Sequence, residues 1–291
     1  MRNAVSELAD RLGIRASLAR RRGQLSGLRG RERPTQIVHC THHKGGTVWL
    51  NRILIDIARV RGWTIDSSFD GGRVPPTDIA LYSVVGTLSP EQVVRAYTGD
   101  DADRSVASQE FLQRTGLQPG RFRGSHMIRD PRDMIVSGWH YHLRCTEPWA
   151  LEPKDRWGGR SYQAMLKGMN RRDGLLAEIE WAAPRTLVHM ARWDYRQPEF
   201  FELRYEELLV DETRWFTRVF GHYGFDASQV EEGLAIAGRY SRRDLSADDP
   251  HVRSGEPGEW REFFEPDHVA LFKVRTGDLL VKLDYESDLE W

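Results

Sequence analysis

The chain has 291 residues, enough for one large domain or two small ones with a core that can enclose a ligand. Hydrophobic residues make up 40% of it and charged residues 29%, which excludes disordered, collagen-like and coiled-coil classes. Because the net charge is −1, a nucleic-acid partner is not expected and any anion site must be local. The two cysteines, Cys40 and Cys145, cannot build a disulfide framework and lack zinc-site spacing, which favours a reducing, cytoplasmic location.

The first part of the chain is rich in arginine. Arginines accumulate ahead of Pro34, while Glu7 and Asp10 dilute the pattern of a transit peptide, so residues 1–34 are predicted to form a basic, solvated extension. Residues 35–291 show no internal repeat and no strong linker, which predicts a single domain. No run of about 18 apolar residues occurs, so no membrane span is expected.

The first predicted structural unit is a strand, a glycine loop and a helix. Residues 36–40 form a short apolar strand, and residues 41–47 form a polar loop. Apolar residues then recur at three- and four-residue steps from Val48 to Ala58, which predicts a helix packed on a sheet. Gly62 suits the C-terminal end of this helix.

Strands and helices alternate along the rest of the chain. In order, we expect a strand over 79–85, a helix opened at Ser89 and running to 96, a polar loop over 97–108, a strand over 124–128, a helix from Pro131 through Trp139, an excursion over 144–174 with one short helix at 162–169, a helix over 175–190, a strand over 200–205, a helix over 214–223 and further helix between 271 and 284. This alternation predicts an α/β fold with a central parallel sheet flanked by helices.

The glycine loop is the first candidate site. Unpaired N–H groups at a helix N-terminus bind phosphate or sulfate, and Gly45 and Gly46 allow the backbone to approach such a group closely. Lys44 adds a mobile positive charge and Thr47 a hydroxyl donor. The loop is neither a Walker A motif, because Lys44 precedes the glycines, nor a G-x-G-x-x-G dinucleotide fingerprint.

Four segments, in order, resemble motifs of the sulfotransferase family. Residues 41–50, THHKGGTVWL, resemble the 5′-phosphosulfate loop, commonly written P-K-S-G-T-T-W. Residues 129–137, RDPRDMIVS, resemble the 3′-phosphate segment R-[ND]-P-[KR]-D with its terminal V-S. Residues 201–208, FELRYEEL, resemble a strand that ends in Y-E-[DE]-L, and residues 253–261, RSGEPGEWR, resemble R-K-G-x-x-G-[DE]-W-K. The resemblance implies the P-loop-like sulfotransferase architecture.

The resemblance also implies a reaction. Family members move a sulfuryl group from 3′-phosphoadenosine 5′-phosphosulfate (PAPS) to a hydroxyl or amine and release 3′-phosphoadenosine 5′-phosphate (PAP). The acceptor expected here is a small molecule or glycan, and no metal is implied. By the motifs, the cofactor-binding residues are Lys44, Gly45, Gly46, Thr47, Val48, Trp49, Arg129, Ser137, Tyr205, Arg253 and Gly255. Lys44 is also expected to stabilise the charge that develops on the leaving oxygen.

The chain departs from the family pattern in several places. Val48 replaces the second threonine of the loop, Gly45 replaces a serine and Ser254 replaces a lysine. The K-[TS]-H motif, which cytosolic members place ahead of the 3′-phosphate strand, has no match, so the general base must come from elsewhere. We expect His43 to be this base because it adjoins the catalytic Lys44. The alternatives are His140, His142, Glu147 and Asp78.

Two other functions remain open at this stage. Without the histidine motif, the chain can be a nucleotide-binding module that holds PAP and turns nothing over. It can also be a divergent nucleotide kinase, which predicts that ATP rather than PAPS stabilises the fold. His39, inside the first strand, is predicted to be a core residue.

Overall fold

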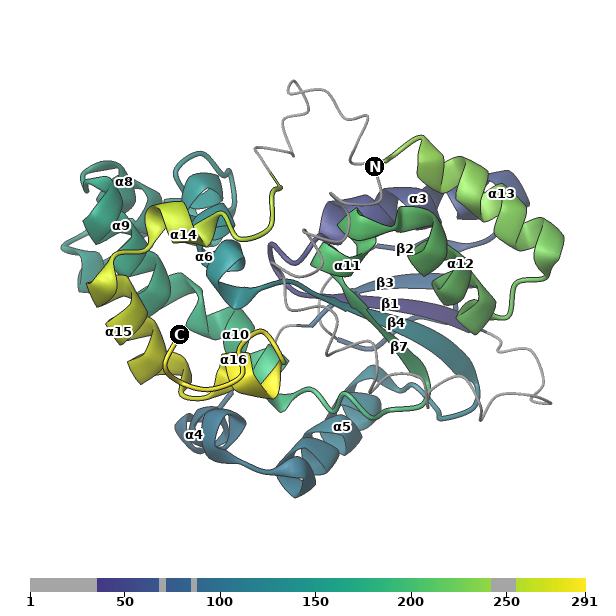
Figure 1. The fold of residues 1–291 in the computed structure, drawn as a ribbon, viewed down its shortest axis with the longest axis horizontal. Helices are drawn as coiled ribbons and strands as arrows, with labels where there is room; N and C mark the ends of the chain where they lie inside the picture. Colours follow the sequence, from purple (N-terminus) through teal and green to yellow (C-terminus); the bar gives the residue numbers. More distant parts are fainter. Residues whose placement is uncertain (1–35, 68–71, 85–87, 242–254) are drawn as a thin grey trace.

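The computed structural model describes residues 36–67, 72–84, 88–241 and 255–291. A parallel five-stranded sheet forms its centre, with strand order β2-β3-β1-β4-β7 (Figure 1). In this order the strands are Ile65–Asp66 (β2), Ile79–Ser83 (β3), Gln36–Thr41 (β1), Phe122–Ile128 (β4) and Phe200–Arg204 (β7). The predicted central parallel sheet is therefore confirmed.

One face of the sheet is covered by four helices, seen at the right of Figure 1. They are Thr47–Arg61 (α3), Tyr205–Val210 (α11), Glu212–Tyr223 (α12) and Ala227–Gly238 (α13). The largest core cluster lies here, where Ile53 and Leu54 of α3 and Phe216 and Phe220 of α12 are buried. On the opposite face Val38 and Cys40 of β1 pack with Phe111 and Trp193. Strands buried on both faces carry the near-continuous apolar runs that the sequence shows.

The remaining elements lie mostly beyond the carboxyl edge of the sheet, where β1 and β4 end (Figure 1). The helices are Pro90–Thr98 (α4), Asp101–Thr115 (α5), Pro131–His142 (α6), Pro148–Leu151 (α7), Tyr162–Lys167 (α8), Arg171–Ala177 (α9), Pro184–Arg192 (α10), Trp260–Phe263 (α14), Pro266–Thr276 (α15) and Leu279–Lys282 (α16). A π-helical turn, Glu178–Ala182, joins α9 to α10. A short antiparallel pair, Pro153–Lys154 (β5) and Arg160–Ser161 (β6), encloses the 3₁₀ turn Asp155–Trp157.

The structure corrects several predicted elements. The prediction of a loop over 97–108 was wrong, because α5 occupies most of this range. The start of α5 is fixed by a capping box between Asp100 and Asp103, and no apolar stripe marks the helix. The strand expected to reach 85 ends at Ser83. The single helix expected over 175–190 is interrupted by the π-helical turn, and the excursion over 144–174 holds more than one helix. The predicted extension, residues 1–34, lies outside the described residues.

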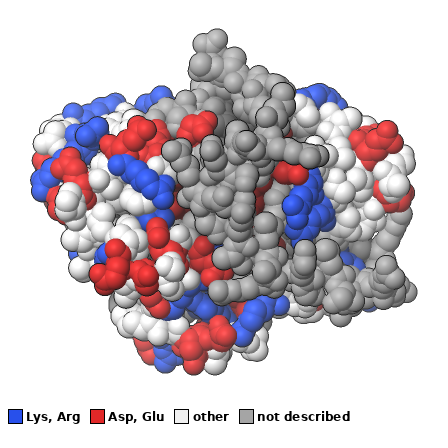
Figure 2. All heavy atoms as spheres, viewed as in Figure 1, with Lys and Arg blue, Asp and Glu red and all other residues white. Residues whose placement is uncertain are grey.

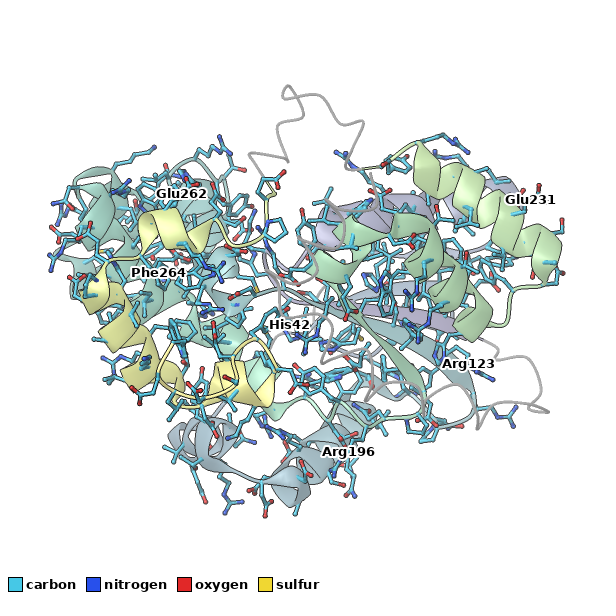
Figure 3. The ribbon with its side chains drawn as sticks, viewed as in Figure 1. His42, Arg123, Arg196, Glu231, Glu262 and Phe264 are labelled. Carbon is cyan, nitrogen blue, oxygen red and sulfur yellow. The ribbon has the colours of Figure 1, made fainter. Side chains whose placement is uncertain are left out.

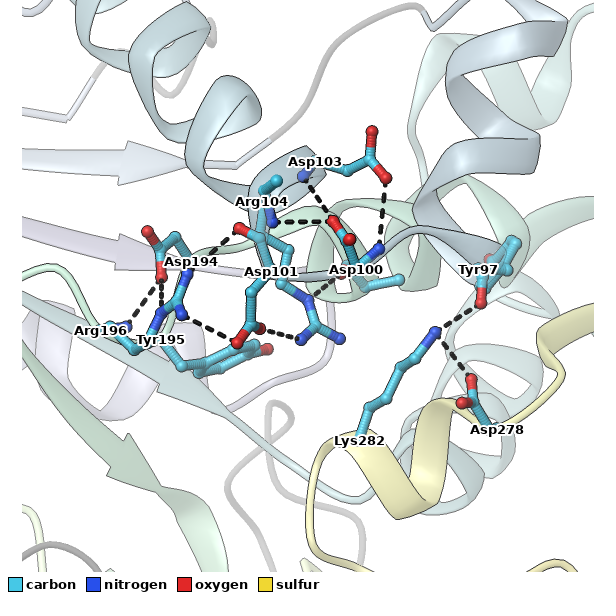
Figure 4. A network of polar contacts seen from close by, with 12 residues as sticks. Tyr97, Asp100, Asp101, Asp103, Arg104, Asp194, Tyr195, Arg196, Asp278 and Lys282 are labelled. Carbon is cyan, nitrogen blue, oxygen red and sulfur yellow. Dashed lines mark hydrogen bonds and ion pairs between the residues drawn. The ribbon is translucent and has the colours of Figure 1, made fainter.

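A polar network joins α5 to the segment that leads into β7 (Figure 4). Arg196 donates to the Asp101 carboxylate at 2.8 Å and to its carbonyl at 3.1 Å. Lys282 of α16 donates to the carbonyl of Tyr97 in α4 at 2.6 Å. These contacts tie α5 to the segment before β7, and α16 to α4.

Arg132 in α6 joins the middle of the chain to its far end. Its guanidinium donates to Asp130 and to Glu286, 154 residues later in the chain. The guanidinium also lies 3.9 Å from the Trp260 ring centre and 4.7 Å from that of Trp291. A buried cation needs such partners, because desolvation alone disfavours its charge.

Charge is mixed over the surface. On the described part of the face in Figure 2, basic and acidic side chains are interspersed. Among the helices of the described ranges, none combines the length and apolar composition that crossing a bilayer requires.

Gly124 of β4 gives a test of this packing. A Cβ built there would lie 2.3 Å from Cδ1 of Phe200 on the neighbouring strand. We expect Gly124→Ala to lower the free energy of unfolding by about 1–3 kcal/mol, because the Phe200 ring must move within a close-packed core. Chemical denaturation measures the change.

Gly221 in α12 is the matched control. A Cβ there meets no atom within 4 Å, and alanine is the better helix former. Gly221→Ala should raise the free energy of unfolding by about 0.5–1 kcal/mol. If both variants shift stability equally, the close packing of β4 against β7 is wrong.

Candidate functional site

The candidate site is the loop between β1 and α3, at the carboxyl edge of the sheet. Lys44 and Gly46 both adopt left-handed backbone conformations, with φ of 63° and 99°. Turns of this kind direct successive N–H groups to one side and form anion-binding concavities. A non-glycine residue in this region carries a strain of order 1 kcal/mol, which is characteristic of functional loops.

The His42 carbonyl holds the loop closed. It accepts hydrogen bonds from the Gly45 N–H at 2.9 Å and from the Thr47 hydroxyl at 3.1 Å. The Thr47 hydroxyl also lies 2.5 Å from that of Thr41. The predicted ligand hydroxyl of Thr47 is therefore engaged within the loop and must rotate before it can donate to a ligand.

A buried polar chain supports this loop from below. Nε2 of His42 lies 2.8 Å from Nε2 of His126, and Nδ1 of His126 lies 2.7 Å from Glu202. The other carboxylate oxygen of Glu202 accepts from the Trp193 indole at 2.8 Å. Figure 3 shows His42 at the sheet edge, between the strands and the helices beyond them. These hydrogen bonds link the end of β1 to β4 and β7, so the register of the sheet sets the position of the loop.

Lys44 is the cation of the loop. Its ammonium lies 4.2 Å from the centre of the Tyr141 ring in α6. Burial, and then the charges of Arg129 and Arg144, lower the pKa of Lys44 to about 8. Three positive groups thus gather at one place, which is the field that an anion requires.

Arg129 follows β4 and is buried. Burial opposes its charge, but the carboxylates of Asp133 and Glu206 raise its pKa. The guanidinium lies 4.7 Å from the Tyr205 ring centre, and its Nε has no hydrogen-bond partner in the part of the chain that the structure describes. An orphaned buried donor on a cation is what a phosphate oxygen would satisfy.

Three hydrogen bonds bring the last predicted motif beside Arg129. The Asp133 carboxylate accepts from the Gly258 N–H at 2.7 Å and the Trp260 N–H at 2.9 Å. The Tyr205 hydroxyl donates to the Gly255 carbonyl at 3.0 Å. The fourth motif therefore adjoins the second, although the predicted ligand Arg253 lies outside the described residues.

Other predicted cofactor residues take different positions. Ser137 lies half-buried on α6, two turns after Arg129, and Val48 is exposed on the first turn of α3. Trp49 is buried and meets the rings of Tyr205 and Phe216 edge-on, at centroid distances of 5.8 Å each. The cofactor-binding roles expected for Trp49 and Tyr205 stay predictions.

Histidines and aromatic residues cluster beside Lys44. The His43 ring stacks on His142 at a centroid distance of 5.3 Å and meets Tyr141 at 5.4 Å. The Tyr141 hydroxyl donates to Glu147 at 2.8 Å. Three of the candidate bases, His43, His142 and Glu147, therefore come together. His140 instead packs on Phe263, and Asp78 is exposed at the amino end of β3, at the edge opposite the loop.

Several site residues were missed by sequence reasoning. Glu178 accepts a hydrogen bond from His142, and Arg144 adds charge near Lys44. Glu206 accepts from the Asp130 N–H at 2.8 Å and from the Tyr285 hydroxyl at 3.1 Å. No local pattern marks them, although Glu206 stands inside the Y-E-E-L segment.

Comparisons with known proteins bear on the fold. No protein-family model matches the sequence. The crystal structure of mouse sulfotransferase SULT7A1 complexed with PAP covers 90% of this chain and 90% of its own, with a TM-score of 0.52 and 15% identity. Two retinol dehydratase structures, one with androsterone and PAP and one with retinol and PAP, have TM-scores of 0.41 and 0.37, identities of 15% and 16%, and cover 86% of this chain and 81% and 82% of theirs. The first similarity confirms the predicted fold, which is that of a sulfotransferase.

Glu206 gives a pH-dependent test of the site. Burial raises its pKa from 4.5 to about 7. A carboxyl whose pKa is raised on folding contributes stability that is complete below about pH 4.5 and is lost as the pH rises through about 7. The free energy of unfolding of the wild type should therefore fall by about 3 kcal/mol relative to Glu206→Gln between pH 4.5 and 8.

Denaturant titrations across this pH range measure the difference. Exposed Glu231, labelled in Figure 3, supplies the control Glu231→Gln, whose curve should run parallel to that of the wild type. A wild-type curve parallel to that of Glu206→Gln would contradict the raised pKa of buried Glu206.

Proposed function

We propose that this chain is a PAPS-dependent sulfotransferase that transfers a sulfuryl group to a hydroxyl of a small molecule or glycan. The observation that carries the proposal is a pair of cations, half-buried Lys44 and buried Arg129, at the carboxyl edge of a sheet with the sulfotransferase fold. The motif resemblance and the fold similarity support the same family.

The residues present fit such a nucleotide. A Cβ at Gly46 would lie 2.9 Å from Cδ2 of Tyr205, and one at Gly45 would lie 3.1 Å from the His42 carbonyl oxygen. Glycine is therefore needed at both positions for the loop to pack against its own neighbours in this conformation. Lys44 and the orphaned Nε of Arg129 supply charged donors for two anionic groups.

The division of labour follows from the motifs. The 5′-phosphosulfate would be held by Lys44, Gly45, Gly46, Thr47 and Val48, with Trp49 nearby. The 3′-phosphate would be held by Arg129, Ser137, Arg253 and Gly255, with Tyr205 close by. When bound, PAPS supplies the sulfuryl group and a phosphate leaving group. Lys44 then presents a preorganised charge, at low local dielectric, to the oxygen on which negative charge develops.

The first prediction separates this function from a nucleotide kinase. PAP should stabilise the protein much more than ATP or adenosine 5′-phosphosulfate, because Arg129 and Ser137 face the 3′-phosphate. At about 100 times its Kd, PAP should add roughly 2.7 kcal/mol of stability, and the melting temperature should rise by about 5–10 °C. Thermal unfolding with each nucleotide measures the shift.

The outcomes distinguish the alternatives. Equal stabilisation by ATP would support a divergent kinase and contradict the proposal. Stabilisation by PAP without release of PAP from PAPS, in the presence of a mixture of acceptors, would support a binding module without turnover.

A second prediction concerns the two cations. Lys44→Ala should lower kcat by about 10²–10³ while affecting PAP affinity less, since one preorganised charge is lost in the transition state. Arg129→Ala should mainly raise the KM for PAPS. Steady-state kinetics and calorimetric PAP titration measure the two effects.

Lys154→Ala and Arg196→Ala are the controls. Lys154 pairs only loosely with Glu152, at 3.7 Å, and Arg196 forms exposed ion pairs away from the loop. Exposed pairs of this kind contribute little, so both variants should keep wild-type kinetics. The same balance of kcat and KM effects in Lys44→Ala and Arg129→Ala would refute the assigned division of labour.

A further inference from the structure

A buried carboxylate stands behind one of the candidate bases. Glu178 lies in the π-helical turn between α9 and α10 and is 2% exposed. Its Oε2 accepts a hydrogen bond from Nδ1 of His142 at 2.9 Å and another from the Tyr162 hydroxyl at 2.9 Å. His142 is equally buried, so this pair is shielded from solvent.

The surrounding structure makes room for this carboxylate. A Cβ built at Gly138, one turn before His142 on α6, would lie 2.5 Å from Oε1 of Glu178. A side chain at this position would therefore push against the carboxylate where it now contacts the histidine. The π-helical turn is itself a geometry that is frequent at functional sites. A buried carboxylate costs free energy unless it is hydrogen-bonded, and Glu178 has two donors.

The contact fixes the tautomer of His142. Because the carboxylate accepts at Nδ1, that nitrogen carries the hydrogen and Nε2 carries a lone pair. Nε2 of His142 is buried and finds no hydrogen-bond partner within the described ranges. A carboxylate that orients an imidazole in this way also stabilises the imidazolium that forms when Nε2 takes a proton.

Nε2 belongs to the cluster around the loop cation. The His142 ring stacks on His43, His43 meets Tyr141, and the Lys44 ammonium lies 4.2 Å from the Tyr141 ring centre. The rings of Tyr141 and His142 also lie 5.5 Å apart, so a single packed ring, that of Tyr141, links the imidazole of His142 to the Lys44 ammonium.

The other candidates lack this arrangement. Within the described part of the chain no carboxylate hydrogen-bonds to His43, and burial, followed by His142 and Lys44, lowers its pKa to about 3. Glu147 already accepts from the Tyr141 hydroxyl and the Trp149 indole. A group with such a low pKa is a weak base at neutral pH.

We propose that His142 is the general base of this chain and that Glu178 is its positioning residue, an inference that rests on the proposed sulfuryl transfer. The acceptor oxygen bonds to sulfur while the bond from sulfur to the 5′-phosphate oxygen breaks, and its electron pair stays on that oxygen. The acceptor proton passes to Nε2 of His142. The imidazolium, paired with Glu178, later releases this proton to solvent.

The activity test compares two acceptors in wild type, His142→Gln and His142→Asn. Phenol, with a pKa of about 10 like that of tyrosine, must lose its proton during the reaction, whereas 4-nitrophenol is largely ionised at pH 8. We expect a loss of about 10²–10⁴-fold with phenol and less than about 10-fold with 4-nitrophenol. Equal losses with the two acceptors would overturn the assignment.

Three further variants separate the base from its neighbours. Glu178→Gln should lose on the order of 10²-fold or more with phenol, whereas Tyr162→Phe, which removes only the other donor to Glu178, should lose less than about 10-fold. His43→Ala should lose less than His142→Gln. If His43→Ala instead erases the difference between the acceptors and His142→Gln keeps it, the base is His43.

A second readout does not depend on turnover. In ¹⁵N-histidine spectra of the full chain, the His142 signals, assigned by their loss in His142→Asn, should report a proton on Nδ1 and none on Nε2. Glu178→Gln should lose this pattern, and Tyr162→Phe should keep it. A proton on Nε2 in the wild type would overturn the proposal. If the wild type sulfates neither phenol nor 4-nitrophenol, this measurement decides alone.

PAP binding distinguishes the two levels of failure. All variants should bind PAP with near wild-type affinity, which also checks that they fold. If the wild type neither binds PAP nor releases it from PAPS, the proposed function fails. If it does both and His142→Gln loses nothing with phenol, only the assignment of the base is overturned.

Discussion

The constraint on which this structure depends is the need to hold positive charge largely out of water, at the edge of a sheet where an anion could reach it. Arg129 is buried and Lys44 is half-buried, and neither forms an ion pair with another described residue. Their charge is sustained by carboxylates set further back, Asp133 and Glu206 for the arginine. Those carboxylates bind backbone N–H groups of their own, so the groups that hold the charge also fasten the segments around it. The same carboxylates therefore stabilise the charge of Arg129 and hold the backbone around it in place.

Polar contacts also hold the glycine loop from below. The left-handed backbone at Lys44 is strained, and strain persists only where the surroundings over-determine it. Here the surroundings are the His42 carbonyl, which closes the loop, and the His42 ring, which rests on His126 and through it on Glu202. Hydrogen bonds in such a buried polar chain are strengthened by the low dielectric around them. The loop therefore inherits its precision from the register of the sheet.

Much of the fold could be predicted from the sequence because its signals are local. The first strand, glycine loop and helix follow from apolar periodicity and two adjacent glycines, and the order of the motifs places the cations on the right strand ends. The predictions failed for elements that depend on tertiary contacts or on helix caps. The α5 helix has few buried residues and begins at a capping box, so no apolar stripe marks it. Glu178 lies 36 residues from His142, on a π-helical turn that no periodicity predicts, so that pairing is visible only in three dimensions.

Arg132 has a consequence for how the site is assembled. It follows Arg129 on the same segment, yet its partners Glu286 and Trp291 come from the far end of the chain. Contacts of such long sequence separation are made late in folding, because the intervening chain must first be closed into a loop. During synthesis, a ribosome that has finished α6 must still add more than half of the chain before this arginine has its full set of partners. The segment that carries Arg129 and Arg132 is thus completed only when the whole chain has folded. Until then, Arg132 lacks the partners that the C-terminal part of the chain supplies.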